Sequence, residues 1–598
     1  MDRSKITWRV VPAVIMVLLF GLGICLVNII PYHLSWTPLI LLIASMGVVL
    51  LPIDSGNLRV KSIIVAATLI ATGFYHAQQQ KESRLTRTPH ISIISQSHDY
   101  TYLLKDVSFT ESYINLEVDV LSLSLPDNKI IPLQGQTALL KVKKDILELE
   151  LKPGQLFSIK SKLQPIDMSP AENQNMYLRN LYQSGIGHIA YIKNFENAIL
   201  KGFSNSPFTY VRYNLRIGAL DLIDKHIQDK DANSILKALL LGYKADLDKA
   251  LKSSFIDSGT MHILAVSGLH TGVIAFILLG ICNFLLFWTS RRSLLRLVFI
   301  ISGLIFFAEI SGGAPPVWRA VIMLSIYLIG KHYSAVSHSL NLIAVAALIL
   351  LVWDHNYLFH LSFQLSFAAV TGIILIYPIL EKIYFPKGKI GKYIVGIIYM
   401  GVAAQIALLP FSFYYFNKIS LLSPLTSVIA ISIAFLCICV GCLFYLSVFL
   451  LPSCTWYIAS FLEGILFILT QTTSFMSSTA LVLIDHLYLK WHESFLIASG
   501  LLAMTIAYHR QSFRLLKVGL VLLVIQSISH LYSQTHHLKD VSIVYEDNEG
   551  ISEIHVGHTA IMLSDEPPSY QTSIKRKEHY ISSIIHYDEL IKKIGDGK

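Results

Sequence analysis

Long apolar stretches recur along most of this chain, and they constrain its fold more than any other feature. A helix needs about 20 apolar residues to cross a bilayer, and such stretches follow one another from residue 9 to residue 533. One polar insert, at about residues 77–261, interrupts them. With 53% hydrophobic and 15% charged residues, the composition lies outside the range of soluble globular proteins. The sequence therefore predicts a polytopic α-helical membrane protein with about 11 to 13 spans.

The spans fall into two blocks, one on each side of the polar insert. The first block is expected near residues 10–31, 37–54 and 60–76. The second is expected near residues 262–288, 296–311, 316–331, 339–353, 358–380, 393–416, 424–450, 455–476, 493–508 and 515–533. We interpret the six cysteines as inert buried thiols. No metal and no cofactor is predicted.

A formal charge of +9 could indicate a polyanion partner, so the position of the basic residues matters. Most of the basic clusters lie in short loops beside the spans: Arg3, Lys5 and Arg9; Arg291, Arg292 and Arg296; Lys382, Lys387, Lys389 and Lys392; and Arg510, Arg514 and Lys517. All these loops lie on one side if the N-terminus is cytoplasmic, as the positive-inside rule requires. Most of the net charge therefore reports topology. It is weak evidence for nucleic-acid binding.

The polar insert changes from continuous apolar runs to strict alternation. Ile114, Leu116, Val118 and Val120 alternate with polar residues, which is the period of a half-buried strand. Several such segments predict a small extracytoplasmic β-barrel or sandwich. From about 208 to 257 the period becomes helical, which predicts amphipathic helices on the bundle or at the membrane surface.

Five segments follow from these patterns. They are N-terminal transmembrane helices (1–76), an extracytoplasmic β domain (77–206), an amphipathic helical segment (207–261), a transmembrane bundle (262–533) and a short extracytoplasmic tail (534–598). The tail has strand character at 541–545 and 551–556 and a helical end.

Polar residues inside the expected spans are the candidates for a functional site. Such residues cost several kcal/mol unless they are paired or face water, and irregular backbone at this depth is tolerated only where it lines a cavity. The candidates are His262, Ser267, Gly268, His270, Arg319, Asp354, Ser362, Gln364, Ser366 and Gln405. Each has a structural alternative: Arg319 could extend to the interface, a single histidine more often bonds to a neighbour, and helix serines bond to backbone carbonyls. Their coincidence in adjacent spans favours a functional interpretation.

The order of short motifs over roughly 240–430 resembles the ComEC competence channels, which import single-stranded DNA across the bacterial inner membrane. The motifs are Leu240-Leu241-Gly242, the segment Phe255 to Gly259, His262 to His270, Gly313 to Met323, Trp353-Asp354, Leu361 to Phe367, Pro410 and Ser423-Pro424-Leu425. The insert and the segment Tyr177 to Ile186 resemble the family's N-terminal region, whose soluble part is OB-like. Many members end in a metallo-β-lactamase-like domain with a His-x-His-x-Asp-His zinc motif, but this chain has only His586-Tyr-Asp588. A nuclease activity in this chain is therefore not expected.

The resemblance implies a DNA path and several partners. Single-stranded DNA and membrane lipid are the direct ones, and an extracytoplasmic DNA receptor and a cytoplasmic motor or single-strand-binding proteins would complete import. An OB-like module holds a strand by stacking and phosphate contacts. Residues 77–206 hold 14 Lys/Arg and 13 Asp/Glu, so any grip there must be local. Lys141, Lys143 and Lys144 are the candidates.

Two other classes of function remain open. Ser267 beside Gly268 is similar to the serine of intramembrane hydrolases, which need a histidine partner, and His360 is the candidate on a second helix. A secondary transporter for a small solute would show inverted repeats, and we find none. We expect no catalytic residue, and we expect the chain to lie in the bacterial inner membrane with a cytoplasmic N-terminus.

Overall fold

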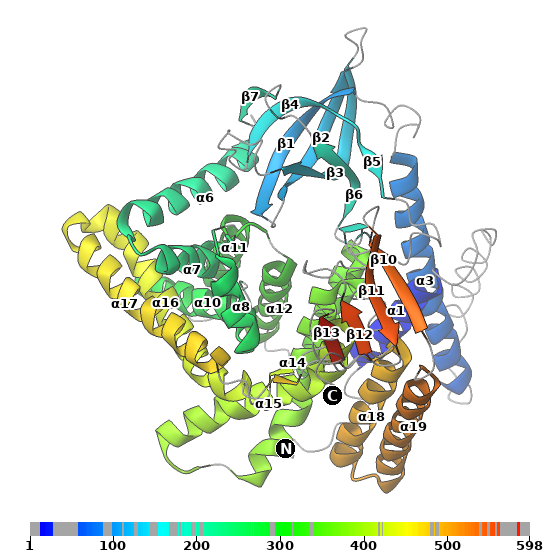
Figure 1. Ribbon diagram of the computed structural model, residues 1–598. Helices are drawn as coiled ribbons and strands as arrows, with labels where there is room; N and C mark the ends of the chain where they lie inside the picture. Colours follow the sequence, from blue (N-terminus) through cyan, green and yellow to red (C-terminus); the bar gives the residue numbers. More distant parts are fainter. Residues whose placement is uncertain are drawn as a thin grey trace, which may run out of the picture.

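A computed structural model describes most of the chain (Figure 1). The residues that it describes are 12–27, 58–87, 98–109, 113–124, 130–143, 154–166, 178, 181–182, 185–192, 195, 198–203, 207–244, 246–264, 266, 268–287, 293–313, 315–333, 339–384, 386–416, 419–420, 423–478, 483–484, 489–537, 541–546, 550–556, 559–562 and 583–586.

Helices occupy every predicted span that lies within the described residues. They are α1 (Pro12–Leu26), α3 (Leu58–Arg87), α9 (Met261–Leu264), α10 (Gly268–Leu285), α11 (Leu294–Ile310), α12 (Pro315–His332), α13 (Ser339–Trp353), α14 (Leu361–Ile383), α15 (Lys389–Tyr415), α16 (Ser423–Leu450), α17 (Pro452–Ser478), α18 (Trp491–Arg510) and α19 (Phe513–His537). The span predicted at 37–54 falls outside the described residues. Six described helices, α10, α14, α15, α16, α17 and α19, are long and apolar enough to cross a membrane, and α1 and α13 are shorter apolar helices. The chain is a multi-pass membrane protein.

One predicted span is not a continuous helix. The prediction placed a single helix at 262–288, but α9 ends at Leu264 and α10 begins at Gly268. Val266 is not helical, and α10 begins at Gly268, a residue type with a low helix propensity.

The polar insert forms one seven-stranded sheet, drawn above the helices in Figure 1. Its strands are β1 (His98–Phe109), β2 (Tyr113–Ser124), β3 (Ile130–Lys143), β4 (Gln155–Ser161), β5 (Gln164–Pro165), β6 (Ile186–Ile192) and β7 (Ile199–Phe203). The order is β5-β6-β3-β2-β1-β4-β7, so the sheet has two edges and the predicted closed barrel is not formed. Because only two residues separate β4 from β5, one short stretch pairs with β1 and then with β6.

The predicted alternation in β2 is confirmed by its burial. Ile114, Leu116, Val118 and Val120 are buried, whereas the residues between them are partly exposed. They pack with the fully buried rings of Tyr100, Tyr102 and Phe157 in the core of the β domain. Period-two patterning therefore specifies which face of the sheet is apolar.

The segment after the sheet contains α6 (Pro207–His226), α7 (Lys230–Leu241) and α8 (Lys249–Asp257). Nine of the twelve residues of α7 are buried, and they pack against α6, α8, α9, α10, α16 and α17 in the largest apolar cluster among the described residues. Of the two predicted positions, on the bundle or at the membrane surface, helix α7 takes the first, and it is buried there as a core helix. Burial alone would lower the pKa of Lys237, but Asp224 and Asp246, each 2.7 Å from Nζ, raise it.

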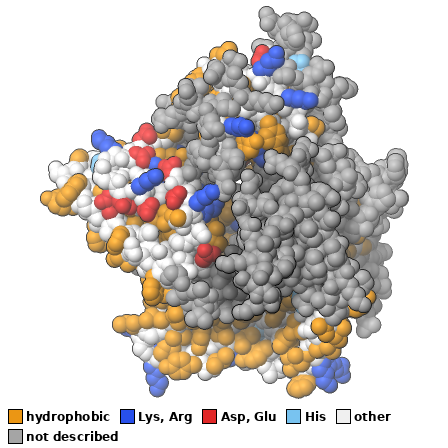
Figure 2. Space-filling model, viewed as in Figure 1, with side chains coloured by type: hydrophobic (Ala, Val, Ile, Leu, Met, Phe, Trp, Pro, Cys, Tyr) orange, Lys and Arg blue, Asp and Glu red, His pale blue; other side chains and the backbone are white. Residues whose placement is uncertain are grey.

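Charged and apolar surfaces are separated on the visible face of the molecule. Figure 2 shows acidic and basic side chains over α6 to α8, and mostly hydrophobic side chains across the lower helices. Helices α17 and α19 expose large apolar side chains, such as Phe467 at 63% and Ile528 at 62%. Such a surface suits contact with lipid.

The C-terminal segment forms a four-stranded sheet in the order β10-β11-β12-β13. Its strands are β10 (Val541–Glu546), β11 (Gly550–Val556), β12 (Thr559–Met562) and β13 (Ser583–His586). The two strands predicted in the tail are confirmed. Residues 583–586 pair in parallel with β12, so this part of the predicted helical end is a strand. A second small sheet joins β8 (Ile419–Ser420) to β9 (Leu483–Ile484).

Acid should destabilise the β domain through His188. This side chain is 3% exposed in β6, and burial lowers its pKa to about 4. The unfolded chain binds a proton near its ordinary pKa of about 6.5, so stability is present above that pH and is lost as pH falls towards 4, by about 3 kcal/mol. Hydrogen exchange of β3 and β6 amides, corrected for intrinsic rates, should rise over this range in the wild type. In His188→Gln the pH dependence should be much weaker, and equal slopes would contradict the assignment.

Candidate functional site

Arg319 is the most unusual of the predicted residues. It lies one turn into α12 and is 2% exposed. Its Nη1 donates to Ser362 Oγ at 3.1 Å, and no carboxylate among the described residues lies within ion-pair distance of it. Its Nε is buried and has no acceptor within the described part of the chain. A guanidinium remains charged at neutral pH, so within the described part of the chain this is a buried cation without a carboxylate partner.

Ser362 and His360 complete what we call the Arg319 cluster (Arg319, His360 and Ser362). Ser362 is in the first turn of α14, and His360 is the residue that precedes that helix. The His360 Nδ1 atom lies 3.2 Å from Ser362 Oγ. The hydroxyl is therefore shared between a guanidinium and an imidazole, and α12 and α14 are joined at their N-terminal ends.

The turn before α12 is held by close backbone packing. Gly312 has a φ of 89°, and a Cβ there would lie 2.8 Å from the Arg216 guanidinium. Arg216 donates to Leu241 O at 3.3 Å, at the end of α7. Gly242 follows with a φ of 67°, and a Cβ at this residue would lie 2.7 Å from Ser311 O. The two glycine motifs therefore position the start of α12 against the end of α7.

Helix α10 begins at the same end of the bundle as α12 and α14. It runs antiparallel to α11, which returns to the Gly312 turn. The first residue of α10, Gly268, faces Ala320 of α12: a Cβ added to Gly268 would lie 3.9 Å from the Ala320 Cβ. Gly268 is exposed. Three helix N-termini thus converge around Arg319, and each contributes positive partial charge from its free N–H groups.

The predicted residues on the α9–α10 segment lie in different environments. His262 is exposed and bonds through Nδ1 to Gly259 O at 3.1 Å. His270 is fully buried. Ser267 lies outside the described residues, so its predicted proximity to His270 or His360 stays a prediction.

Two other predicted residues have structural contacts. Asp354 caps a short 3-10 helix (His355–Phe359), accepting from Asn356 N at 2.9 Å. Gln364 donates to Leu358 O at 3.1 Å and accepts from Tyr415 at 3.0 Å, which fixes α14 to α15. Ser366 and Gln405 are partly exposed, on α14 and α15. The structure does not bring these four residues into hydrogen-bond contact with Arg319.

The predicted lysines of the β domain lie beside aromatic residues that the sequence analysis missed. Lys141 Nζ is 5.4 Å from the ring centre of Tyr191, and Tyr191 is 53% exposed. The ring of Tyr113 meets that of Tyr191 edge-on at 6.1 Å, and Lys143 pairs with Tyr113 across β2 and β3. Alternation puts all four side chains on the outer face. Lys144 lies outside the described residues.

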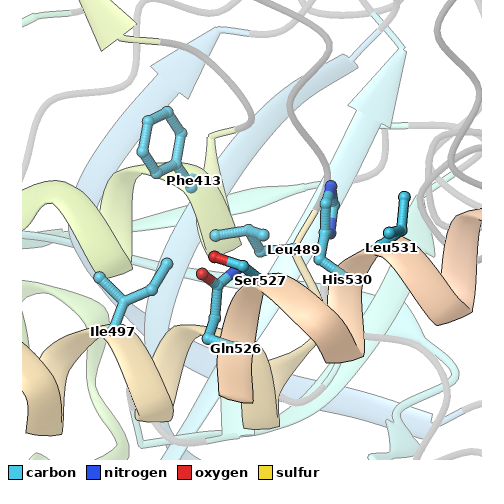
Figure 3. Close-up of a pocket in the computed structure, with 7 residues that line it drawn as sticks. All are labelled: Phe413, Leu489, Ile497, Gln526, Ser527, His530 and Leu531. Atoms are coloured by element: carbon cyan, nitrogen blue, oxygen red, sulfur yellow. The ribbon is translucent and has the colours of Figure 1, made fainter. Parts of the chain in front are cut away.

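A cavity of about 480 Å³ lies between α15, α18 and α19. Figure 3 shows its lining residues: Phe413, Leu489, Ile497, Gln526, Ser527, His530 and Leu531. Beside it, the buried carboxylate of Glu493 accepts from Lys490 N at 2.7 Å and lies 3.3 Å from His530 Nδ1. None of the predicted residues lines this cavity.

A metal site is not formed by the described residues. No group of three or more His, Cys, Asp or Glu side chains among them could hold an ion. Cys439 and Cys442 have C-x-x-C spacing on α16, and both are free thiols.

Comparison with known proteins identifies the helical part of the chain. Residues 239–512 match the family model described as competence protein. Over these residues the chain is similar to the competence-protein family. The matched region begins in α7 and ends after α18, so it contains the Arg319 cluster and both glycine turns.

Two relatives match this chain over 211 and 233 residues. ComE operon protein 3 of Bacillus subtilis is 29% identical over 211 residues, which is 35% of this chain and 26% of that protein. Recombination protein 2 of Haemophilus influenzae is 27% identical over 37% of this chain and 29% of its own length. The matches thus span less than a third of these two relatives. No solved structure matches the chain.

Substitution of Gly242 by alanine should disturb the site through α12. A left-handed backbone strains any residue with a Cβ, and the new methyl group would collide with Ser311 O. We expect a loss of about 1–3 kcal/mol of stability, measured as a lower midpoint of thermal unfolding in detergent. Gly280→Ala is the matched control, because a Cβ at that position would meet no neighbouring atom within 4 Å. Equal midpoints for the two variants would contradict this role.

Proposed function

We propose that this chain forms a channel that imports single-stranded DNA across the inner membrane of a bacterium during natural transformation. The observation that carries the proposal is the Arg319 cluster. A buried cation with no carboxylate partner in the described structure is costly, and an anion that visits the site would offset that cost. DNA presents such an anion at every nucleotide.

The positions of the helix ends agree with this role. Three N-termini and one guanidinium form a positive region at one end of the bundle, and backbone N–H groups at helix N-termini are suited to phosphate. If the N-terminus is cytoplasmic, as the basic loops indicate, this end faces outwards. Arg319 would then meet the strand where it enters, and Gly268 and His262 would lie on the accessible side of the path.

The outer face of the β domain supplies an earlier contact. Tyr191 and Tyr113 offer ring surface for stacking, and Lys141 and Lys143 offer charge for phosphates, which together are the features of single-strand binding sites. In Figure 1, β1 points towards the helices, and β2 pairs antiparallel with β1, so β2 begins at the end of the sheet nearest the helices. A strand held there would be close to the bundle.

Import would also require other proteins. A receptor would deliver DNA on the outer side, and a motor or single-strand-binding proteins would draw the strand inwards. The similarity of residues 239–512 to the competence-protein family supports the role in DNA uptake, while the single-strand substrate and the membrane in which the chain resides are part of the proposal.

Arg319→Ala should reduce DNA import strongly. A hydrogen bond to a charged group contributes about 1.5–3 kcal/mol, so we expect a fall of about 10- to 100-fold in cytoplasmic arrival of labelled DNA. Arg319→Lys should retain part of the activity, because it keeps the charge and loses the planar donor geometry. The assay compares these variants with wild type, His270→Ala and a deletion strain of a competent host. Normal import in the deletion strain would rule out the channel.

Tyr191→Ala should weaken binding of an oligothymidylate by the full-length protein in nanodiscs. Stacking contributes about 1–3 kcal/mol per base, so an increase in Kd of about tenfold is expected by fluorescence anisotropy. Lys141→Ala should reduce the salt dependence, by about 0.7 in the slope of log K against log salt. Lys160→Ala is the control, since this exposed lysine lies on β4, away from both rings. An effect of Lys160→Ala equal to that of Lys141→Ala would show that only net charge matters.

A further inference from the structure

We propose that Gln80, about two turns before the end of α3, is a positioning residue for the Arg319 cluster. It lies outside the matched family region, on the helix that leads into the β domain. The inference rests on the proposed function for its consequence in DNA import, but not for its geometry.

Gln80 uses both ends of its amide on a single turn of the bundle. Its Oε1 accepts from His355 N at 3.1 Å and from His355 Nδ1 at 2.7 Å. Its Nε2 donates to Trp353 O at 3.0 Å and to His76 Nε2, also at 3.0 Å. The hydrogen bond from His355 N joins residues 275 positions apart. Together with the bond to Trp353 O, it fixes the short connection between α13 and the 3-10 helix that follows it.

That connection continues directly to the Arg319 cluster. Asp354 caps the 3-10 helix through Asn356 N, and His360 N bonds to Tyr357 O at 3.0 Å. His360 in turn precedes α14, where Ser362 holds Nη1 of Arg319. These hydrogen bonds lie within or directly beside one five-residue helix. We therefore expect a shift of His355 to be transmitted through this short helix to the first turn of α14.

Helix α3 is held by close packing against α1. Helices α1 and α3 pack so closely that a Cβ on Gly23 would collide with Ile70 O, and a Cβ on Gly73 would collide with Phe20 O. The ring of His76 also lies against Phe20, with ring centres 6.0 Å apart. Gln80 therefore extends from a helix that is fixed by α1, and its amide is the polar contact between α3 and the 3-10 helix beside the apolar packing of the same elements.

Hydrogen exchange of the full-length protein in nanodiscs, followed by mass spectrometry, tests this without DNA. In Gln80→Ala, the amides of Phe363 and Gln364, which bond to His360 O and do not touch Gln80, should exchange about tenfold faster, the equivalent of about 1.4 kcal/mol. Gln80→Glu keeps the acceptor for His355 but replaces the donor to Trp353 O with a carboxylate oxygen, so its exchange should fall between wild type and Gln80→Ala. Gln79→Ala is the matched control, because Gln79 bonds to Tyr75 one turn earlier on α3, and it should have no effect.

Faster exchange confined to residues 353–357, or the same change in Gln79→Ala, would overturn the proposal. Gln80→Leu, which preserves most of the side-chain volume without its polar atoms, decides the question if Gln80→Ala does not fold. In DNA import, the double variant Gln80→Ala/Arg319→Ala should be no worse than Arg319→Ala alone, because residues that act through one site are not additive. Absence of import in the wild type would remove the proposed function, while the exchange result would still decide the role of Gln80.

Discussion

The hydrogen bond between Arg319 and Ser362 is the interaction around which the rest of the bundle is arranged. It joins α12 to α14 at the ends where both helices begin, and it leaves a guanidinium charge where water has little access. A protein that keeps such a charge without a carboxylate beside it loses stability. That loss is understandable where a mobile anion must be bound weakly enough to be released again.

Several features that look unrelated along the chain serve to place this contact. The end of α7 and the turn before α12 approach each other because glycine is present at positions 242 and 312, and Arg216 fits into the space. The start of α14 follows from a capped 3-10 helix, and Gln80 holds that helix from the opposite end of the sequence. The Arg319 cluster is therefore positioned by α3 and by the bundle together.

Other charged side chains of the helical part are stabilised by partners that differ from one position to the next. Lys237 lies between two aspartates in the core below α6, and Glu463 of α17 accepts from the backbone N–H groups of Gln228 and Asp229 at the start of α7. Glu493 is capped by Lys490 N and lies beside His530. Each of these charges has a partner of opposite charge or a backbone N–H donor, whereas Arg319 has no carboxylate partner among the residues that the structure describes.

The sequence by itself determined the class of protein and the position of its helices, because about 20 apolar residues in lipid have few alternatives to a helix. It also determined the strands of the insert, because alternation with a period of two assigns one face to the core. It selected Arg319 and Ser362 as polar residues at membrane depth, but not the contact between them, which depends on how α12 and α14 pack. Only the tertiary structure showed that the sheet has two edges, that α7 is buried, that Tyr113 and Tyr191 accompany the lysines, and that Gln80 reaches His355. These facts arise from contacts between residues far apart in the chain, and local patterns carry no information about such pairs.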